Sequence, residues 1–251
     1  MSHTNCLMSV LLLLLIGLIS CDTRCIKFTG KTQRITRVVA DFNTLSIDEL
    51  SPVRVILYQD NTNLAYLTGG KNILSHVQTN VDNQRLSVGI DIPRCDHLTQ
   101  REITLEVPYQ TLNSITHQGY DDIIFRDTLR VPAFRANLND QGDLWLLIRT
   151  QQLSVNLART ANAEVSGVTD HLEVRTSDDP FAPSTSFGAF RGKNLTAKTC
   201  NVLLQGEGNC EVRVSDTLRV DLRGVGNVIY YGTPKVIERT ITGAGKVIKG
   251  N

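Results

Sequence analysis

The sequence predicts an all-β protein whose parallel strands stack as the coils of a β-solenoid, and two observations predict this fold. A glycine turn recurs, because Gly224-Val225-Gly226-Asn227-Val228 is followed 19 positions later by Gly243-Ala244-Gly245-Lys246-Val247. Apolar residues also alternate with polar ones, as in Leu172-Glu173-Val174-Arg175. Alternation means that each strand buries one face, whereas strands of a doubly wound parallel sheet have continuous apolar runs.

The first residues predict export. Leu7 to Ile19 form a 13-residue apolar block, which is too short to span a bilayer and is typical of a signal-peptide core. The block ends in Leu18-Ile19-Ser20-Cys21, which resembles the lipobox of bacterial lipoproteins. That resemblance implies cleavage between Ser20 and Cys21 and acylation of Cys21 with fatty acids such as palmitate. An ordinary secretory signal and an uncleaved anchor are the alternatives, because basic residues are missing before the block.

These signals give the predicted domain organisation. We expect a signal peptide at 1–20, a lipidated tether at 21–35 and a single β domain at 36–251, divided into an N-terminal β part at 36–110 and regular coils at 111–251. Two or three acyl chains hold a protein at a membrane more firmly than one chain does. We therefore expect an exported protein of the bacterial cell envelope, with its lipid in the membrane and the outer-membrane or periplasmic side favoured.

The composition excludes some classes of partner. The chain is 41% hydrophobic and 20% charged, with a net charge of +1, which is typical of a folded domain and does not favour nucleic acid as a partner. Gly224 and Gly226 lack the third glycine and the following helix of a phosphate-binding loop. We interpret them as a solenoid corner and expect no cofactor.

The cysteines favour disulfides over a metal site. Once Cys21 is lipidated and the signal is removed, Cys25, Cys95, Cys200 and Cys210 remain. An even number in an exported chain favours disulfides, with three connectivities open. Cys200 and Cys210 flank a glycine turn and could join across one corner, which would leave Cys25 with Cys95. No C-x-x-C or His-rich spacing supports zinc.

The N-terminal β part is predicted from period-two runs such as Val53-Arg54-Val55 and Ile103-Thr104-Leu105, bounded by turn residues. Only 72–80 could hold a turn or two of helix. We expect this part to cap one end of the coils, because open strand edges invite pairing.

The regular coils are predicted from strand starts that recur about every 20 residues. Trp145 lies in a run, 144–148, that is apolar on both faces, so we expect the N-terminal part to cover some of that wall. The corners contain Gly, Asn and Asp, the residues that tight turns need. The expected strand starts are Leu112, Phe134, Leu153, Leu172, Leu195 and Leu218.

One coil is interrupted, and the interruption is a candidate binding loop. Residues 177–190 combine aromatic rings with Pro, Ser, Thr and paired Asp. Aromatic side chains on a protruding loop can stack on sugars or anchor a partner protein. Alternatively, these rings fold back over the end of a coil. The candidate residues are Asp178, Asp179, Phe181, Phe187 and Phe190.

Acidic corners and scattered histidines raise alternatives to binding. Carboxylates at 121, 122, 140 and 143 could stack as ligands for Ca²⁺, although ordinary turn chemistry explains them as well. Stacked carboxylates could also serve a polysaccharide lyase or a glycosidase, and the sequence cannot supply the distance between them. The histidines at 76, 97, 117 and 171 have no nucleophile motif beside them, so we expect no catalytic residue and no metal site.

Several short motifs resemble the head GIN domain of putative autotransporter adhesins. They include Val39-Ala40-Asp41-Phe42, Leu105-Glu106-Val107-Pro108 and, most specifically, the terminal Gly-x-Gly-x-(Val/Ile)-x-Tyr-x-Gly-x-Pro pattern over 224–234. The resemblance covers roughly Thr36 to the C-terminus. It implies a right-handed parallel β-helix and a lipoprotein of Bacteroidota-type envelopes. It implies no activity, so no catalytic residue carries over.

These observations together predict a lipid-anchored, non-catalytic module for adhesion to glycan or protein. The rivals are a carbohydrate-active β-helix enzyme and a structural partner in envelope assembly. A rigid repeat scaffold, an anchor and the lack of a catalytic motif favour adhesion.

Overall fold

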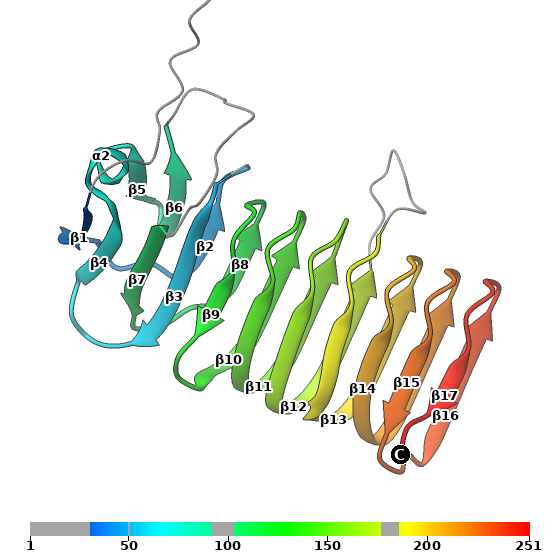
Figure 1. Ribbon diagram of the computed structural model, residues 1–251. Helices are drawn as coiled ribbons and strands as arrows, with labels where there is room; N and C mark the ends of the chain where they lie inside the picture. Colours follow the sequence, from blue (N-terminus) through cyan, green and yellow to red (C-terminus); the bar gives the residue numbers. More distant parts are fainter. Residues whose placement is uncertain (1–30, 50, 92–102, 177–185) are drawn as a thin grey trace, which may run out of the picture.

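The computed structural model describes residues 31–49, 51–91, 103–176 and 186–251, and there the fold is all-β with almost no helix (Figure 1). Its 17 strands form one curled sheet. The predicted all-β class is therefore confirmed. The predicted signal peptide and cleavage site lie outside the described residues, as do Ser20, Cys21, Cys25, Cys95, Asp178, Asp179 and Phe181. Residues 21–30 of the predicted tether also lie outside them, whereas 32–35 belong to the first strand, β1 (Thr32–Val38), so the folded domain begins before the predicted end of the tether.

The N-terminal region mixes antiparallel and parallel pairs. Strands β1 and β4, β4 and β7, and β5 and β6 are antiparallel, whereas β2 pairs with β8 and β3 with β9 in parallel. These parallel pairs continue the sheet into the regular strands. The elements are β1 (Thr32–Val38), β2 (Thr44–Ile47), β3 (Val53–Gln59), β4 (Leu64–Gly70), α2 (Lys71–Leu74), β5 (Val77–Asp82), β6 (Arg85–Ile90) and β7 (Ile103–Tyr109).

The regular strands pair in parallel, each with the strand one repeat later. They line up side by side in Figure 1 from β8 to the C-terminus. The elements are β8 (Ser114–His117), β9 (Ile123–Phe125), β10 (Leu129–Leu138), β11 (Leu144–Leu157), β12 (Ala163–Thr176), β13 (Phe190–Leu204), β14 (Cys210–Leu222), β15 (Val228–Tyr231), β16 (Val236–Ile241) and β17 (Val247–Lys249).

The alternation of buried and exposed residues is interrupted within each long strand, as β11 shows. In β11, alternate residues are buried over 144–150 and again over 153–157, whereas Gln151 and Gln152 are both exposed. The buried Thr150 hydroxyl donates a hydrogen bond to the Gln152 carbonyl at 3.1 Å, which satisfies a backbone group where the pattern changes. Both halves of the strand contribute to one core. We call the parts before and after this point the first and second halves.

The predicted strand starts have the right period but the wrong place. Four of them occupy one ladder of paired residues, yet this ladder opens the second half of long strands rather than their beginning. The prediction for Leu195 is wrong. Leu195 pairs with Gly167, and Cys200 occupies the corresponding position in the ladder, beside Leu172. Leu112 lies just before β8. The four residues in register are Phe134, Leu153, Leu172 and Leu218.

Glycines stack at the corners because the chain of the preceding repeat lies too close for a side chain. A Cβ on Gly208 would be 2.0 Å from the Gly188 carbonyl oxygen, and one on Gly226 would be 2.2 Å from that of Gly208. A second column, Gly206, Gly224 and Gly243, is packed as closely. The recurring glycine turn is therefore a corner, as predicted, and backbone contact is the reason for its composition.

A second ladder at the corners is made by Asp and Asn side chains. Each side-chain oxygen accepts a hydrogen bond from a main-chain N–H one repeat later, at 2.9 to 3.2 Å. Ala189 follows Asn162 in this ladder and has no side-chain acceptor to continue it. The ladder residues are Asp122, Asp143, Asn162, Asn209 and Asn227.

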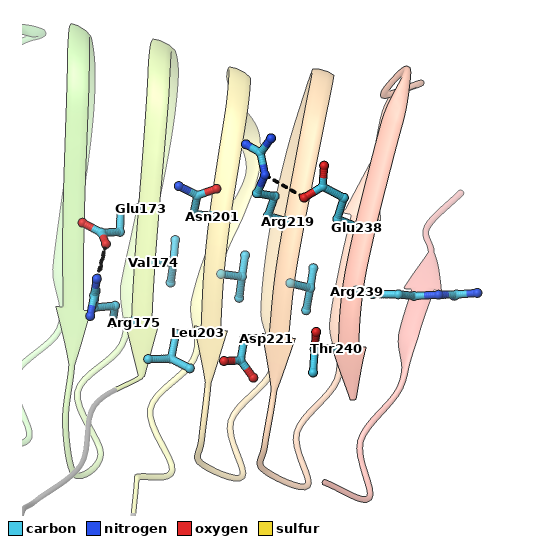
Figure 2. Close-up of a pocket in the computed structure, with 12 residues that line it drawn as sticks. Glu173, Val174, Arg175, Asn201, Leu203, Arg219, Asp221, Glu238, Arg239 and Thr240 are labelled. Atoms are coloured by element: carbon cyan, nitrogen blue, oxygen red, sulfur yellow. Dashed lines mark hydrogen bonds and ion pairs between the residues drawn. The ribbon is translucent and has the colours of Figure 1, made fainter. Parts of the chain in front are cut away.

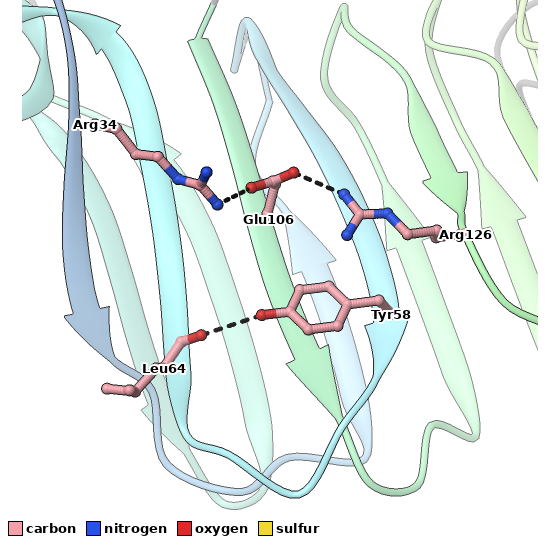
Figure 3. A network of polar contacts seen from close by, with 5 residues as sticks. All are labelled: Arg34, Tyr58, Leu64, Glu106 and Arg126. Carbon is pink, nitrogen blue, oxygen red and sulfur yellow. Dashed lines mark hydrogen bonds and ion pairs between the residues drawn. The ribbon is translucent and has the colours of Figure 1, made fainter.

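Charged and aromatic side chains join the N-terminal region to the regular strands. Glu106 on β7 accepts hydrogen bonds from Arg34 on β1 at 2.5 Å and from Arg126, which follows β9, at 2.6 Å (Figure 3). The two guanidinium groups also lie over aromatic rings, Arg34 over Tyr66 and Arg126 over Tyr58. These exposed contacts position the strands and contribute modestly to stability.

The opposite end of the sheet is open within the described residues. Strand β16 pairs with β14 on one side only, and all six of its residues are exposed. Its register continues the buried row of β14, in which Ile237 follows Leu218 and Arg239 follows Val220. Arg239 therefore occupies an inward position on β16.

Candidate binding faces

The outward side of the second halves forms a continuous polar face. The strand register places Ser154, Glu173, Asn201, Arg219 and Glu238 side by side across five strands. Neighbouring strands are about 4.8 Å apart, so hydrogen-bonding groups repeat at that spacing. The same row reaches the N-terminal region through Arg135, Ser114, Thr44 and Arg85.

Side chains on the polar face hold one another in place. Asn156 donates an amide hydrogen bond to Asn137 on the preceding strand at 2.7 Å. Glu173 is bonded to Arg175 at 2.6 Å, and Arg219 to Glu238 at 2.8 Å (Figure 2). Exposed ion pairs add little stability. They do restrict the paired side chains to fewer conformations before a ligand binds.

Three hollows open on this polar face. The largest, about 990 Å³, extends from Thr44 and Arg85 across β8 to β13. A second, of about 370 Å³, lies over Asn137, Asn156 and Leu203. The third is the one in Figure 2, about 410 Å³, and is lined by residues 173–175, 201–203, 219–221 and 238–240. The first two are lined mainly by amide, hydroxyl and guanidinium groups, which form hydrogen bonds readily with hydroxylated ligands. The third also contains carboxylate and apolar side chains.

The carboxylates on the polar face have arginine partners. Glu173 pairs with Arg175, Glu238 with Arg219, and Asp221 with Arg223. A glycosidase uses a pair of carboxyl groups that flank the bond to be cut, whereas each of these carboxylates is bound to an arginine. The arrangement suits ligand binding better than acid catalysis.

The acidic corners interact with backbone groups and with arginines. Asp122 and Asp143 belong to the ladder, Asp121 pairs with Arg54 at 3.2 Å, and Asp140 pairs with an arginine at 159. Burial raises the pKa of Asp122 and of Asp140. Within the described ranges, no group of three or more His, Cys, Asp or Glu side chains is arranged for a metal ion.

Among the described residues, the histidines do not form a catalytic group. His117 is buried, accepts a hydrogen bond at Nδ1 from the Gly119 N–H, and donates from Nε2 to the Asp121 carbonyl. Its neighbours fix a neutral tautomer, and burial lowers its pKa. His76 and His171 are exposed and bond to a carbonyl and a hydroxyl. The fourth histidine, at position 97, lies outside the described residues.

The candidate binding loop is only partly an exposed feature. Phe187 is 52% exposed and can meet a ligand. Phe190, however, is fully buried and pairs in register with Ala163 and Cys210. The prediction that Phe190 contributes to binding is therefore wrong, because the period-two alternation of β13 directs its ring into the core.

The structure does not contain the predicted disulfide between Cys200 and Cys210. Both are free, buried thiols. Cys200 lies in the ladder of Leu172 and Leu218, whereas Cys210 pairs with Phe190, so each fills an apolar position in its own ladder. Burial raises the pKa of both thiols, which makes them unreactive.

The outward side of the first halves differs from the polar face. Trp145 and Leu147 on β11 are 37% and 41% exposed. The expectation that the N-terminal part covers this run is therefore wrong for the described residues. The N-terminal strands extend the sheet edge to edge instead, through β3 beside β9, and so do not form a layer over it.

These features define a class of all-β repeat proteins that present two broad outward faces and a single continuous core. The chain belongs to the family described as putative auto-transporter adhesin, head GIN domain, whose model matches residues 41–234. The resemblance noted in the sequence is thereby confirmed.

Solved structures share this fold. A putative adhesin from Bacteroides fragilis is 19% identical and superposes with a TM-score of 0.80, over 90% of this chain and 100% of that one. A putative adhesin from Parabacteroides distasonis is 18% identical, with a TM-score of 0.66 over 90% and 99%. A putative lipid binding protein from the same organism is 17% identical, with a TM-score of 0.67 over the same shares.

A search of curated proteins finds no match. Within the described ranges, no helix has the length and hydrophobicity that crossing a membrane requires.

Proposed function

We propose that this protein is a non-catalytic adhesion module of a bacterial cell envelope that binds glycan along its polar face. The observation that carries this proposal is the uninterrupted row of polar side chains from β6 to β16, which combines hydroxyl, guanidinium, amide and carboxylate groups. Hydroxyl-rich polymers bind through many such hydrogen bonds, each modest, and a repeating row provides them in series. The description of the family as adhesins supports this proposal.

A glycan panel assayed for both retention and product release tests the proposal. Binding without release is the expected result. Release of shortened sugars would establish the rival carbohydrate-active enzyme, and failure to bind any glycan, with a stable co-purifying protein, would establish the assembly partner.

A double variant, Asn137→Ala with Asn156→Ala, removes a bonded amide pair from the face. We expect its glycan affinity to fall about tenfold, the equivalent of about 1.4 kcal/mol. Asn63→Ala, which removes an exposed amide from the loop between β3 and β4, is the matched control and should bind as the parent does.

The anchor and the winding complete the proposal. We propose that Cys21 is acylated after cleavage at Ser20, so that the residues between Cys21 and β1 tether the domain to the membrane. Cys21→Ala should abolish membrane partitioning, whereas unchanged partitioning without acyl mass on the parent protein would contradict the anchor.

We also propose that the curled sheet winds as a right-handed parallel β-helix, which the one-repeat register of β10 to β14 supports. An experimental structure, in which the winding direction of the chain can be determined, tests this proposal.

A further inference from the structure

An exposed apolar and basic patch lies on the outward side of the first halves, away from the polar face. On β11, Trp145, Leu147 and Arg149 point outward in succession. The register sets Ile124 beside Trp145, and Arg130 and Val168 on either side of Arg149. We call these six residues the Trp145 patch.

The apolar members of the patch are unusual for an outward face. Trp145, Leu147 and Val168 are each more than a third exposed. Val168 lies outward by the alternation of β12 and pairs in register with Arg149. Beside it, Gly167 has a φ of 124°, and a Cβ there would be 1.9 Å from the Ile148 carbonyl oxygen. A cluster of exposed apolar residues around a tryptophan is typical of an interaction surface.

The basic members of the patch, Arg130 and Arg149, form no ion pair among the described residues. Arg130 and Arg149 are register partners on adjacent strands, about 4.8 Å apart along the sheet. Among the described residues, neither guanidinium takes part in an ion pair or a side-chain hydrogen bond, whereas Arg126 and Arg54 both have acidic partners. Two stacked like charges repel each other, and a bound anion would relieve that repulsion.

We propose that the Trp145 patch is a subsite for the carboxylated sugar residues of an acidic polysaccharide. Trp145 and Leu147 pack against the apolar face of a sugar ring, while Arg149 and Arg130 donate charge-assisted hydrogen bonds to its carboxylate. This inference rests on the proposed adhesion to glycan and adds a second, chemically distinct surface to it.

The acidic residues around the patch favour a narrow chain over a broad anionic surface. Glu164 and Glu211 lie in the row that contains Trp145, and Asp60 and Asp127 border a hollow with Arg130. An anionic bilayer lying flat on this side would meet those carboxylates. A single polymer that crosses the arginine row avoids most of them.

The patch provides its own reporter, because Trp145 is the single tryptophan of the chain. The experiment titrates the mature protein with polygalacturonate and with its methyl ester, which has the same backbone without the charge. We expect a saturable change in tryptophan emission with polygalacturonate that weakens with salt, and no change with the ester.

Variants separate the subsite from general electrostatics. Arg149→Gln should lower the affinity for polygalacturonate at least tenfold, whereas Arg191→Gln, on the same face between two glutamates, should leave it unchanged. Trp145→Phe should retain weaker binding by calorimetry. A thermal unfolding scan of each variant shows whether the fold persists.

Three outcomes would overturn the inference: an equal response to the ester, an unchanged affinity in Arg149→Gln, or a response to phosphatidylglycerol vesicles but not to polygalacturonate. Its failure is distinguishable from that of the proposed function. If neutral glycans bind the polar face while Trp145 emission stays constant with polygalacturonate, only the subsite fails. If no glycan binds at all, both fail.

Discussion

The regular strands β10 to β14 and the N-terminal strands β1 to β7 belong to one sheet, but different interactions fix their positions. In the regular strands, backbone contact at glycine corners and the Asp/Asn ladder repeat once in each repeat. In the N-terminal region, side-chain networks that occur only once fix the positions of the strands, such as those of Arg37 and Glu106. Repeated geometry leaves a periodic trace in the sequence, whereas a single network leaves none.

The largest effect is expected from filling a corner. Gly208→Ala places a Cβ 2.0 Å from the Gly188 carbonyl oxygen, and that backbone cannot move without disturbing the next repeat. We expect the free energy of unfolding to fall by about 3 kcal/mol, measured by chemical denaturation. Gly70→Ala in the N-terminal region is the control, because its nearest contact is a side-chain oxygen at 3.4 Å. Equal losses in the two variants would refute the contrast.

A smaller but local effect is expected from Arg37. Its guanidinium donates to the carbonyls of Val77 and Leu74, at 2.6 and 2.7 Å, and joins β1 to α2 and β5. Arg37→Ala leaves both carbonyls without this donor and should cost about 2 kcal/mol. Hydrogen exchange should quicken in α2 and β5 and not in β12 or β13. The control, Arg34→Ala, breaks an exposed ion pair and should cost under about 1 kcal/mol.

His117 lies where the two regions meet, and its effect depends on pH. Burial lowers its pKa in the folded state, although Asp121 and Asp143 act in the opposite direction. The unfolded chain therefore takes up the proton first, so stability falls as the pH drops below about 6.5.

Denaturation at several pH values should show a loss of up to about 1.4 kcal/mol per pH unit in that window. His117→Gln should remove this component, and His171→Gln should retain it. If the free energy of unfolding varies with pH in the same way in the parent and in His117→Gln, the buried neutral histidine does not cause the loss of stability.

The smallest effect is expected at Tyr109, also at this junction. Its ring packs edge-on against Phe125, which packs in turn against Phe134. Its buried hydroxyl has no hydrogen-bond partner among the described residues, and burial raises the pKa of Tyr109 to about 12. Tyr109→Phe retains the packing and removes an unsatisfied group, so we expect a gain of up to about 1 kcal/mol in thermal unfolding. A loss of stability would reveal a partner for the hydroxyl.

The same contrast explains what the sequence could predict. Alternation and glycine spacing predicted the all-β class, the corners and the ladder of Phe134, Leu153 and Leu172, because these follow from local geometry. They misplaced Leu195, because bulges between β13 and its neighbours shift the register, and a bulge depends on contacts between strands.

The candidate sites were harder to predict for a similar reason. A face is made of residues about 20 positions apart, such as Arg130 and Arg149, and its chemistry becomes visible only when the register is known. In the sequence, the one signal of this patch is the run 144–148 around Trp145, which is apolar on both faces and therefore predicts a covered wall rather than an exposed surface. Phe190 was assigned to a loop, although the alternation that begins at that residue directs it inward.

Arg239 affects how the open strand edge of β16 can associate with other copies of the chain. Chains displayed side by side offer one another a strand edge on β16 that a matching strand could extend into a fibre. Joining two such ends would bury Arg239 in the row that follows Val220, without a counter-ion. The charge thus acts as a terminator of polymerisation that costs the single molecule little, because on the open end its guanidinium remains in water.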